Sequence, residues 1–280
     1  MAIVVERRFS SAARWSRRLA TFSCVLLVVA GAAHRFALLD TMPFLCVCAI
    51  VAGLAIAALV LAAIGFRGLW RRGDEAGLNA TAGVLAAALV LAPGALAAYR
   101  VATSPSLADV STDLADPPSL ALAARQRTIG MNPVAGIDAA HAMLQQAAYP
   151  EITGRRYGLP PDRVRAIVED LVARRGWTVG DGDTRLAPDG PGVFRIEAVA
   201  RSLVFGLASD VSIRLIDEGD STYVDMRSAS RFGSNDMGDN ARRIAAFLVD
   251  LDTEVALQAG VAVPVETPET APEPLPPPAQ

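Results

Sequence analysis

Two arginines near the carboxyl end of the chain are spaced so that they can bind one anion together. Arg227 and Arg231 lie four residues apart in a segment with strand-like alternation, so they project from one face, about 13 Å apart along it. A turn then leads into a predicted helix, whose first N–H groups attract anions. Guanidinium groups bind phosphate or carboxylate through paired hydrogen bonds. This interpretation assigns a ligand to Arg227, Ser230, Arg231, Asn235 and Asn240.

The same two arginines could instead have a structural role, and this is the interpretation that we favour for them. They can pair with carboxylates of their own chain and so fix the last helix. The candidate partners are Asp225, Asp113, Asp116 and Asp236. We therefore predict a structural polar network that includes Asp113, Asp225 and Asp236. Removing Arg231 from such a network leaves a buried carboxylate uncompensated, which costs about 2–4 kcal/mol.

Patterns typical of catalysis or metal binding are scarce. His141 is the one histidine after residue 104, and it lies in an alanine-rich helical patch without a Gly-x-Ser-x-Gly or His-x-x-x-His pattern. Asp109, Asp113 and Asp116 have the spacing of turn and capping residues rather than of metal ligands. We expect no catalytic residue, no metal and no cofactor. A Ser–His–Asp triad assembled from distant positions stays compatible with the sequence.

Three apolar stretches indicate a membrane protein. They cover about 19–39, 44–66 and 78–101, and a helix needs about 20 mostly apolar residues to cross a bilayer. The first is the weakest and resembles a cleavable signal, but we favour an uncleaved helix because its apolar run continues past the small residues. Ala49, Gly53 and Ala57 form a small-residue stripe, for which we favour packing inside a three-helix bundle, with dimerisation as the alternative.

The distribution of charge predicts the orientation. Residues 1–103 have a formal charge of +6 and residues 104–280 one of −9, and every cation is an arginine. The basic N-terminus, 1–18, and the loop before the third span hold most of the arginines of the first part, which predicts a cytoplasmic N-terminus and a periplasmic C-terminal domain in a bacterial inner membrane. The acidic domain argues against nucleic acid as a partner.

The region 104–260 is predicted to be a soluble domain of the α+β class. A loop over 104–118, a helical patch near 138–148 and a short strand within 149–158 come first. A helix from Pro160, strands near 177–179, 194–201, 211–216 and 223–231, and a helix over about 236–258 follow. This β-α-β(4)-α order is shared by helix-grip and TATA-binding-protein-like folds, whose curved sheet can enclose an apolar cavity. Residues 261–280 are expected to be a disordered Pro/Glu-rich tail.

Several segments together resemble a known family. They are Asp109-Val110-Ser111-Thr112-Asp113, Ile196-Glu197-Ala198-Val199-Ala200, Asp225-Met226-Arg227-Ser228-Ala229-Ser230-Arg231 and the run from Asn235 to Ile244. The likeness is to the domain of unknown function 1499 family and covers about 105–252. Bacterial members often carry a few leading membrane helices. Ser209-Asp210 departs from the pattern, which has two adjacent acids there. The resemblance implies a domain identity and no activity.

The sequence therefore favours a non-enzymatic membrane protein whose exported domain binds an anionic or lipidic ligand. Besides the bilayer, the expected partners are an anionic lipid or small metabolite, and another membrane protein or a second copy of the chain. The alternative is a structural or assembly subunit of an envelope complex, and a hydrolase is the third choice.

Overall fold

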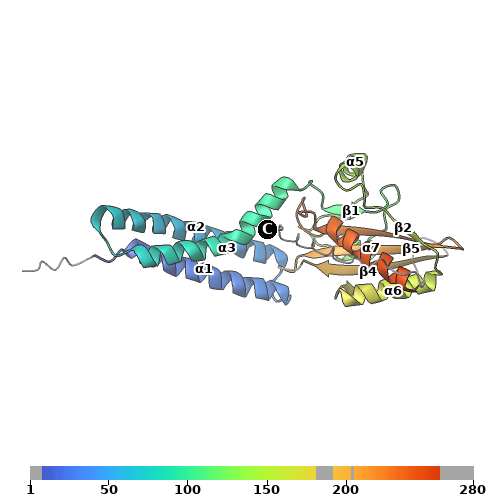
Figure 1. Cartoon of the computed structure of the whole chain (residues 1–280), viewed down its shortest axis with the longest axis horizontal. Helices are drawn as coiled ribbons and strands as arrows, with labels where there is room; N and C mark the ends of the chain where they lie inside the picture. Colours follow the sequence, from blue (N-terminus) through green and yellow to red (C-terminus); the bar gives the residue numbers. More distant parts are fainter. Residues whose placement is uncertain (1–7, 181–191, 203–204, 259–280) are drawn as a thin grey trace, which may run out of the picture.

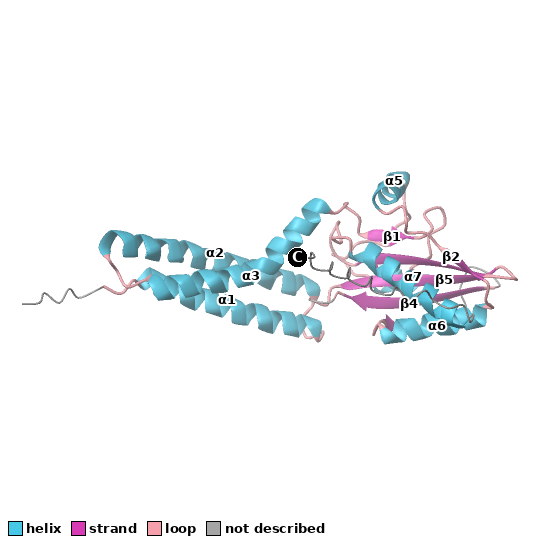
Figure 2. Cartoon of the chain, in the orientation of Figure 1, coloured by secondary structure: helices cyan, strands magenta, loops and turns pink. Residues whose placement is uncertain are grey.

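The computed structural model describes residues 8–180, 192–202 and 205–258. They form an elongated molecule with a helical bundle at one end and a sheet domain at the other (Figure 1). Every strand lies in the second part, as the colouring by secondary structure makes clear (Figure 2). The predicted α+β architecture, with three apolar helices followed by an antiparallel sheet, is confirmed. The predicted tail, 261–280, lies outside the described residues.

Three helices are long and apolar enough to cross a membrane: α1 (Ser11–Arg35), α2 (Thr41–Arg72) and α3 (Gly77–Thr103). The helices extend beyond the predicted spans, most clearly at the start of α1 and the end of α2. Backbone hydrogen bonds continue past the apolar run into arginine-rich turns, because helical structure does not require apolar residues. Hydropathy thus delimits the part of a helix that suits lipid, and not the helix itself.

The bundle packs through small residues. Ala20, Ala55 and Ala87 are buried where the helices meet. A Cβ atom at Gly83 of α3 would lie 2.1 Å from Ser16 Oγ of α1, so only glycine allows this approach. The predicted packing stripe of α2, at residues 49, 53 and 57, is instead exposed. That prediction was wrong because spacing alone does not say which face of an apolar helix meets its neighbours.

Helix α3 passes through Pro93 and bends (Figure 1). Proline removes one backbone hydrogen bond and its ring displaces the preceding turn, which kinks a helix without ending it when its neighbours support it. The carboxyl-terminal part of α3, which follows the bend, leads into the domain.

The domain contains one six-stranded antiparallel sheet. Its strands are β1 (Asp109–Ser111), β2 (Arg155–Tyr157), β3 (Thr178–Val179), β4 (Val193–Arg201), β5 (Ala208–Asp217) and β6 (Thr222–Ser230). The strand order is β1-β6-β5-β4-β3. Strand β2 also pairs with β6, at the beginning of β6, whereas β1 pairs with its end. The predicted Glu218-Gly219-Asp220 turn joins β5 to β6. Strand β1 lies where we expected a loop, because three residues are too few to show alternation.

One face of the sheet is covered by α6 (Pro161–Arg174) and α7 (Asp239–Gln258) (Figure 1). The apolar positions predicted for α6 are all buried, and they join the inward residues of β4, β5 and β6 in a single core. Large side chains such as Ile213, Met226 and Phe247 are fully buried between the sheet and these helices, and the apolar cavity that this element order allows stays a prediction.

Two further helices lie outside that core: α4 (Ala121–Gln126) and α5 (Ala139–Ala148). Helix α4 was not predicted. Helix α5 matches the predicted patch, and Asp138 caps it by accepting a hydrogen bond from the N–H of His141. Gln145 of α5 pairs with both backbone groups of Ser111, at 3.1 and 2.6 Å, so the helix covers the outer edge of β1.

Replacing Leu248 by alanine tests the core under α7. Leu248 is 1% exposed, so Leu248→Ala should lower the free energy of unfolding by about 2–5 kcal/mol through lost burial and a new cavity. Its neighbour Val249 is 60% exposed, and Val249→Ala should change the value by no more than about 0.5 kcal/mol. Denaturant unfolding of the full chain in detergent measures both. Equal losses would contradict the assignment of the buried face.

Candidate anion-binding site

The face of the sheet opposite α6 and α7 is lined with charged side chains. Side chains alternate between the two faces of a strand, so the apolar residues face the helices and the polar residues face the other way. The buried charged residues of this second face are Arg195, Glu197, Asp210, Arg214, Asp225 and Arg227. The segment 105–137 covers this face. Buried charges require partners, so we followed each predicted site residue to the groups that it contacts.

Arg227 binds a carboxylate that we did not expect. Its Nε and Nη2 donate to Asp109 of β1 at 3.0 and 2.6 Å, and Nη2 also donates to the carbonyl of Ala135. The side chain is 4% exposed. Asp225, the expected partner nearest in sequence, lies on the same strand but binds Arg214.

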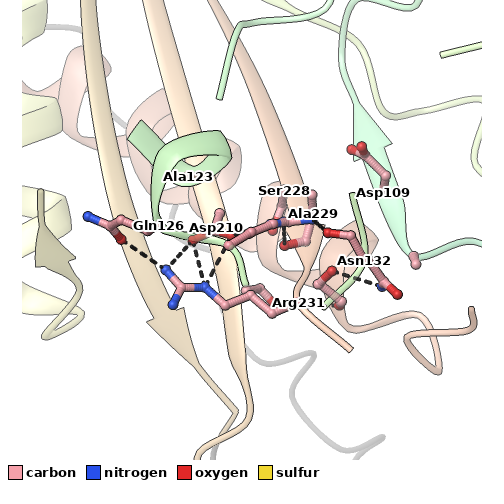
Figure 3. A network of polar contacts seen from close by, with 12 residues as sticks. Asp109, Ala123, Gln126, Asn132, Asp210, Ser228, Ala229 and Arg231 are labelled. Carbon is pink, nitrogen blue, oxygen red and sulfur yellow. Dashed lines mark hydrogen bonds and ion pairs between the residues drawn. The ribbon is translucent and has the colours of Figure 1, made fainter. Parts of the chain in front are cut away.

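Arg231 is engaged by Asp210 (Figure 3). Its Nε and Nη2 donate to Asp210 Oδ1 at 3.0 and 2.6 Å, and Gln126 of α4 accepts from the same guanidinium. Arg127 donates to the other oxygen of Asp210 at 3.0 Å. Asp210 is the single acid of the Ser209-Asp210 pair. In this chain it joins two guanidinium groups.

Arg214 and Asp225 form the centre of a third cluster. They lie opposite each other on β5 and β6 and make a bidentate pair, and Asp116 adds a second carboxylate at 2.7 Å. Asp113 lies 3.8 Å from the same guanidinium. Burial alone would lower the pKa of Arg214, but the hydrogen bonds and charges of Asp225 and Asp116 outweigh it and raise the pKa. The structure thus brings Asp113 and Asp225 together.

Glu197 holds α4 in place. Its carboxylate accepts hydrogen bonds from the backbone N–H groups of Ala121, Leu122 and Ala123, at 3.0, 2.9 and 3.3 Å. These are the N–H groups that the first turn of a helix leaves without a partner. Burial raises the pKa of Glu197, and the three donors offset only part of the rise.

Replacing Asp210 tests the charged face. Asp210→Ala leaves the buried guanidinium groups of Arg127 and Arg231 without a carboxylate, so the free energy of unfolding should fall by about 3–5 kcal/mol. Arg231→Ala should cost less, because Arg127 still compensates Asp210. The control is Asp170→Ala on the surface of α6, where the pair with Arg174 is exposed and should contribute less than about 1 kcal/mol. Denaturant unfolding of the three variants measures these losses, and a loss for Asp210→Ala no larger than that for Asp170→Ala would contradict the role of Asp210.

Glu197 also predicts a dependence of stability on pH. Because its pKa is raised by folding, the folded chain binds this proton more tightly than the unfolded chain. The free energy of unfolding contributed by Glu197 therefore decreases as the pH rises from the unfolded pKa through the folded one. Glu197→Gln should remove this decrease, so the variant gains stability relative to the wild type as the pH rises above about 4, the ordinary pKa of a glutamate. A relative loss over that range would show that the N–H donors dominate instead.

Asp236 shapes the start of α7. We expected the helix to begin near Asp236, but it begins at Asp239, because the Asp236 carboxylate accepts from the N–H groups of Gly238 and Asn240 at 2.9 and 2.6 Å. Burial raises the pKa of this carboxyl despite both donors. Met237 and Gly238 adopt φ values of +59° and +74°. A methionine in this region is strained, and such strain is often found at functional sites.

A polar cluster lies between the sheet and the first turns of α7. Asn240 donates to Ser230 Oγ at 3.0 Å and to the carbonyl of Ala108, while its Oδ1 accepts from Ser228 Oγ at 2.8 Å. Arg243 donates through Nη1 to the same Oδ1 at 2.6 Å and to Ser228 Oγ at 3.0 Å. Ser209 Oγ lies 3.4 Å from Ser230 Oγ.

Arg243 differs from the arginines of the opposite face. Among the residues that the structure describes, no carboxylate forms an ion pair with it, and neither Nε nor Nη2 has a hydrogen-bond acceptor. Burial lowers the pKa of Arg243, and the more distant charges of Asp239 and Asp236 offset this only in part. An arginine nevertheless stays charged at neutral pH. The cluster therefore contains a half-buried cation whose charge is incompletely compensated.

A pocket of about 50 Å³ opens beside this cluster. Its polar wall includes Ser209, Ser230, Asn235 and Arg243, and Leu207, Phe232 and Met237 form the apolar wall. Two acids, Asp236 and Asp239, also line it; the first accepts from the N–H groups of Gly238 and Asn240, and the second pairs with Arg242. By the usual measure this volume accommodates a few water molecules, and therefore a group about as large as a phosphate or carboxylate. Spare guanidinium donors next to hydroxyl groups are what such an anion requires.

The predicted ligand residues therefore divide between two faces. Ser230, Asn235 and Asn240 lie at or beside this pocket, whereas Arg227 and Arg231 lie on the opposite face with carboxylate partners. The analysis of the sequence missed Arg243. The signal was its position beside the buried stripe of α7, three residues after Asn240, which makes a long cation point toward the sheet.

The arrangement around His141 bears on the hydrolase alternative. A second, larger pocket of about 260 Å³ is lined by His141, Asp109, Ser106 and Ser230 among others. His141 Nε2 donates to the backbone carbonyl of Asp109, while the Asp109 carboxylate is bound by Arg227. Ser230 Oγ accepts from Asn240. No Ser–His–Asp triad is formed among these groups. Within the described ranges, we also find no group of three or more His, Cys, Asp or Glu residues arranged to hold a metal ion.

Comparison with known proteins gives the family of the domain. No curated protein and no solved structure matches the chain. One family model matches residues 109–251, which are half of the chain and include the whole sheet and most of α7. The chain belongs to the family described as protein of unknown function (DUF1499).

Proposed function

We propose that this protein is a membrane-anchored binding module that holds a small anionic group, a phosphate or a carboxylate, in the pocket at Arg243. The observation that carries the proposal is the incompletely compensated guanidinium of Arg243 beside a pocket. Arg127, Arg214, Arg227 and Arg231, by contrast, all bind carboxylates of the chain.

The energetics support an external anion. Within the described part of the chain, Nε and Nη2 of Arg243 have no carboxylate partner and are not among the buried polar atoms that lack a hydrogen bond, so water reaches them. An anion that replaces this water gains charge-assisted hydrogen bonds to both donors. The groups that fix Arg243, Ser228 and Asn240, use only its Nη1. Nε and Nη2 are thus left to bind two oxygens of one ligand, with Ser209 and Ser230 as further hydroxyl groups. Nothing in this arrangement requires a reaction.

We place the protein in a bacterial inner membrane with the domain on the periplasmic side. Eight of the ten arginines in residues 1–103 lie before α1, in its first turns, or at the end of α2, and two lie at the opposite ends of the helices. Positive charge is retained on the cytoplasmic side. Both the N-terminus and the turn between α2 and α3 then face the cytoplasm.

Binding of inorganic phosphate to the full chain in detergent tests the proposal. Calorimetry should detect binding to the wild type, and Arg243→Gln should weaken it about 10- to 100-fold, because hydrogen bonds to a charged group contribute about 1.5–3 kcal/mol. Arg243→Lys should give an intermediate affinity, since it keeps the charge but loses the paired donors.

The control is Arg174→Gln. Arg174 lies at the end of α6, is 51% exposed and pairs with Asp170 and Glu254, which do not line the pocket. Its replacement should leave phosphate affinity within about twofold, which a screening effect would allow. Equal denaturation midpoints for the two variants exclude unfolding as the cause. Equal affinities for the two variants would refute the role of Arg243.

A second candidate function, assembly with another protein, is favoured by one observation. Helix α5 turns its polar residues, His141 and Gln145, toward β1, and exposes Met143 and Leu144 on its outer side. Ile129, in the preceding loop, is also fully exposed. Apolar side chains gathered on a surface are typical of protein contacts.

A further inference from the structure

We infer that the anionic group in the Arg243 pocket is the headgroup phosphate of a membrane lipid from the leaflet next to the domain, and that the acyl chains lie against the outer end of α3. This inference rests on the proposed function and names its ligand. Four observations support it: the attachment of the pocket walls, the exposure of α3, the mixed lining of the pocket and its small volume.

One wall of the pocket is attached to the corner between α1 and α2. Ser202 and Leu207 flank a hairpin that joins β4 to β5, and Phe205 in that hairpin contacts the bundle. His34 Nδ1 donates to the carbonyl of Phe205 at 2.6 Å, and the rings of Phe205 and Phe44 lie 5.6 Å apart. This wall is therefore located where two spanning helices reach the end of the bilayer.

The other wall is attached to the end of α3. Asn235 Nδ2 donates to the carbonyls of Val101 and Ser104 at 3.3 and 3.2 Å. In Figure 1 the N-terminal end of α7, where the pocket lies, is the end directed at the bundle. A ligand in the pocket is thus at the level of the helix ends, which is where lipid headgroups lie.

The end of α3 presents an apolar surface without a protein partner among the described residues. After the bend at Pro93, residues 98–103 are all exposed. Leu96, Tyr99 and Val101 are 53%, 66% and 47% exposed. Helix α3 is long and apolar enough to span the membrane, so acyl chains are the solvent that fits these side chains.

The lining and size of the pocket fit one end of an amphiphile. Leu207, Phe232 and Met237 lie beside the guanidinium, which is an unusual setting for a small hydrophilic ion. The volume of about 50 Å³ accepts a phosphate but excludes a large body. A lipid places only its charged group in such a pocket and keeps its apolar part outside.

The test compares a lipid with its headgroup alone on the full chain. Native mass spectrometry of the chain released from nanodiscs of phosphatidylglycerol and phosphatidylcholine in equal amounts should show phosphatidylglycerol retained about tenfold over phosphatidylcholine, because the choline cation of the latter already compensates its phosphate. Arg243→Gln should abolish this preference, and Arg174→Gln should keep it. Glycerol 3-phosphate, which has the headgroup chemistry without chains, should bind at least about tenfold more weakly than the lipid.

A change on α3 separates the two proposals. Val101→Ser removes apolar surface near the pocket while leaving the carbonyl that accepts from Asn235, so it should weaken retention of phosphatidylglycerol and leave the affinity for glycerol 3-phosphate unchanged. Binding of glycerol 3-phosphate that depends on Arg243 and equals that of the lipid would overturn the lipid assignment while the anion-binding module stands. Absence of any Arg243-dependent binding, of lipid or of soluble phosphate, would overturn both.

Discussion

Buried pairs of arginine and carboxylate hold the segment 105–137 on the sheet, and the form of the domain depends on them. The strands alternate apolar and charged residues, so the face opposite α6 and α7 needs a covering that brings complementary charges. Asp109, Asp116 and Arg127 of the segment supply them to Arg227, Arg214 and Asp210. Detaching the segment would leave Arg227 without its carboxylate, and Arg214 and Asp210 would each keep only the partner that lies outside the segment, Asp225 and Arg231. This constraint also positions β1 and α4, which have little apolar surface of their own.

The carboxylate partners of Arg127, Arg214, Arg227 and Arg231 make the different surroundings of Arg243 informative. Arg243 lies near the amino-terminal end of α7, among hydroxyl and amide groups that satisfy one of its nitrogens. The loop before this helix contains the strained Met237. An arginine that served only stability would be expected to bind a carboxylate, as its counterparts do. The site is also where the domain contacts α1, α2 and α3. The proposed binding site and the attachment to the three N-terminal helices therefore share residues such as Asn235.

Much of the fold could be predicted, because the relevant signals are local. The amphipathic stripe of α6 and the alternation of β4, β5 and β6 each repeat within one element, and burial follows directly from the period. The β-α-β(4)-α order corresponds to β2, α6, β3 to β6, and α7. Strand β1 and helix α4 could not be predicted. Helix α4 receives the cap for its N–H groups from Glu197, which is about 75 residues away in the chain, and β1 exists through its register with β6.

The candidate site, like the fold, could be predicted from the sequence only in part. Composition and hydropathy are sufficient to identify three membrane helices, an acidic domain and an arginine-rich strand, since these properties belong to single segments. The choice of partner for each arginine depends on which carboxylate the register and the covering loop bring within hydrogen-bond distance. Arg227 binds Asp109 and Arg231 binds Asp210, although Asp225 is nearer to both in sequence. Arg243 was left with no such partner by the same packing. Only the folded chain distinguishes a compensated guanidinium from one that can bind a ligand, because charge compensation depends on distances in space and not on spacing along the chain.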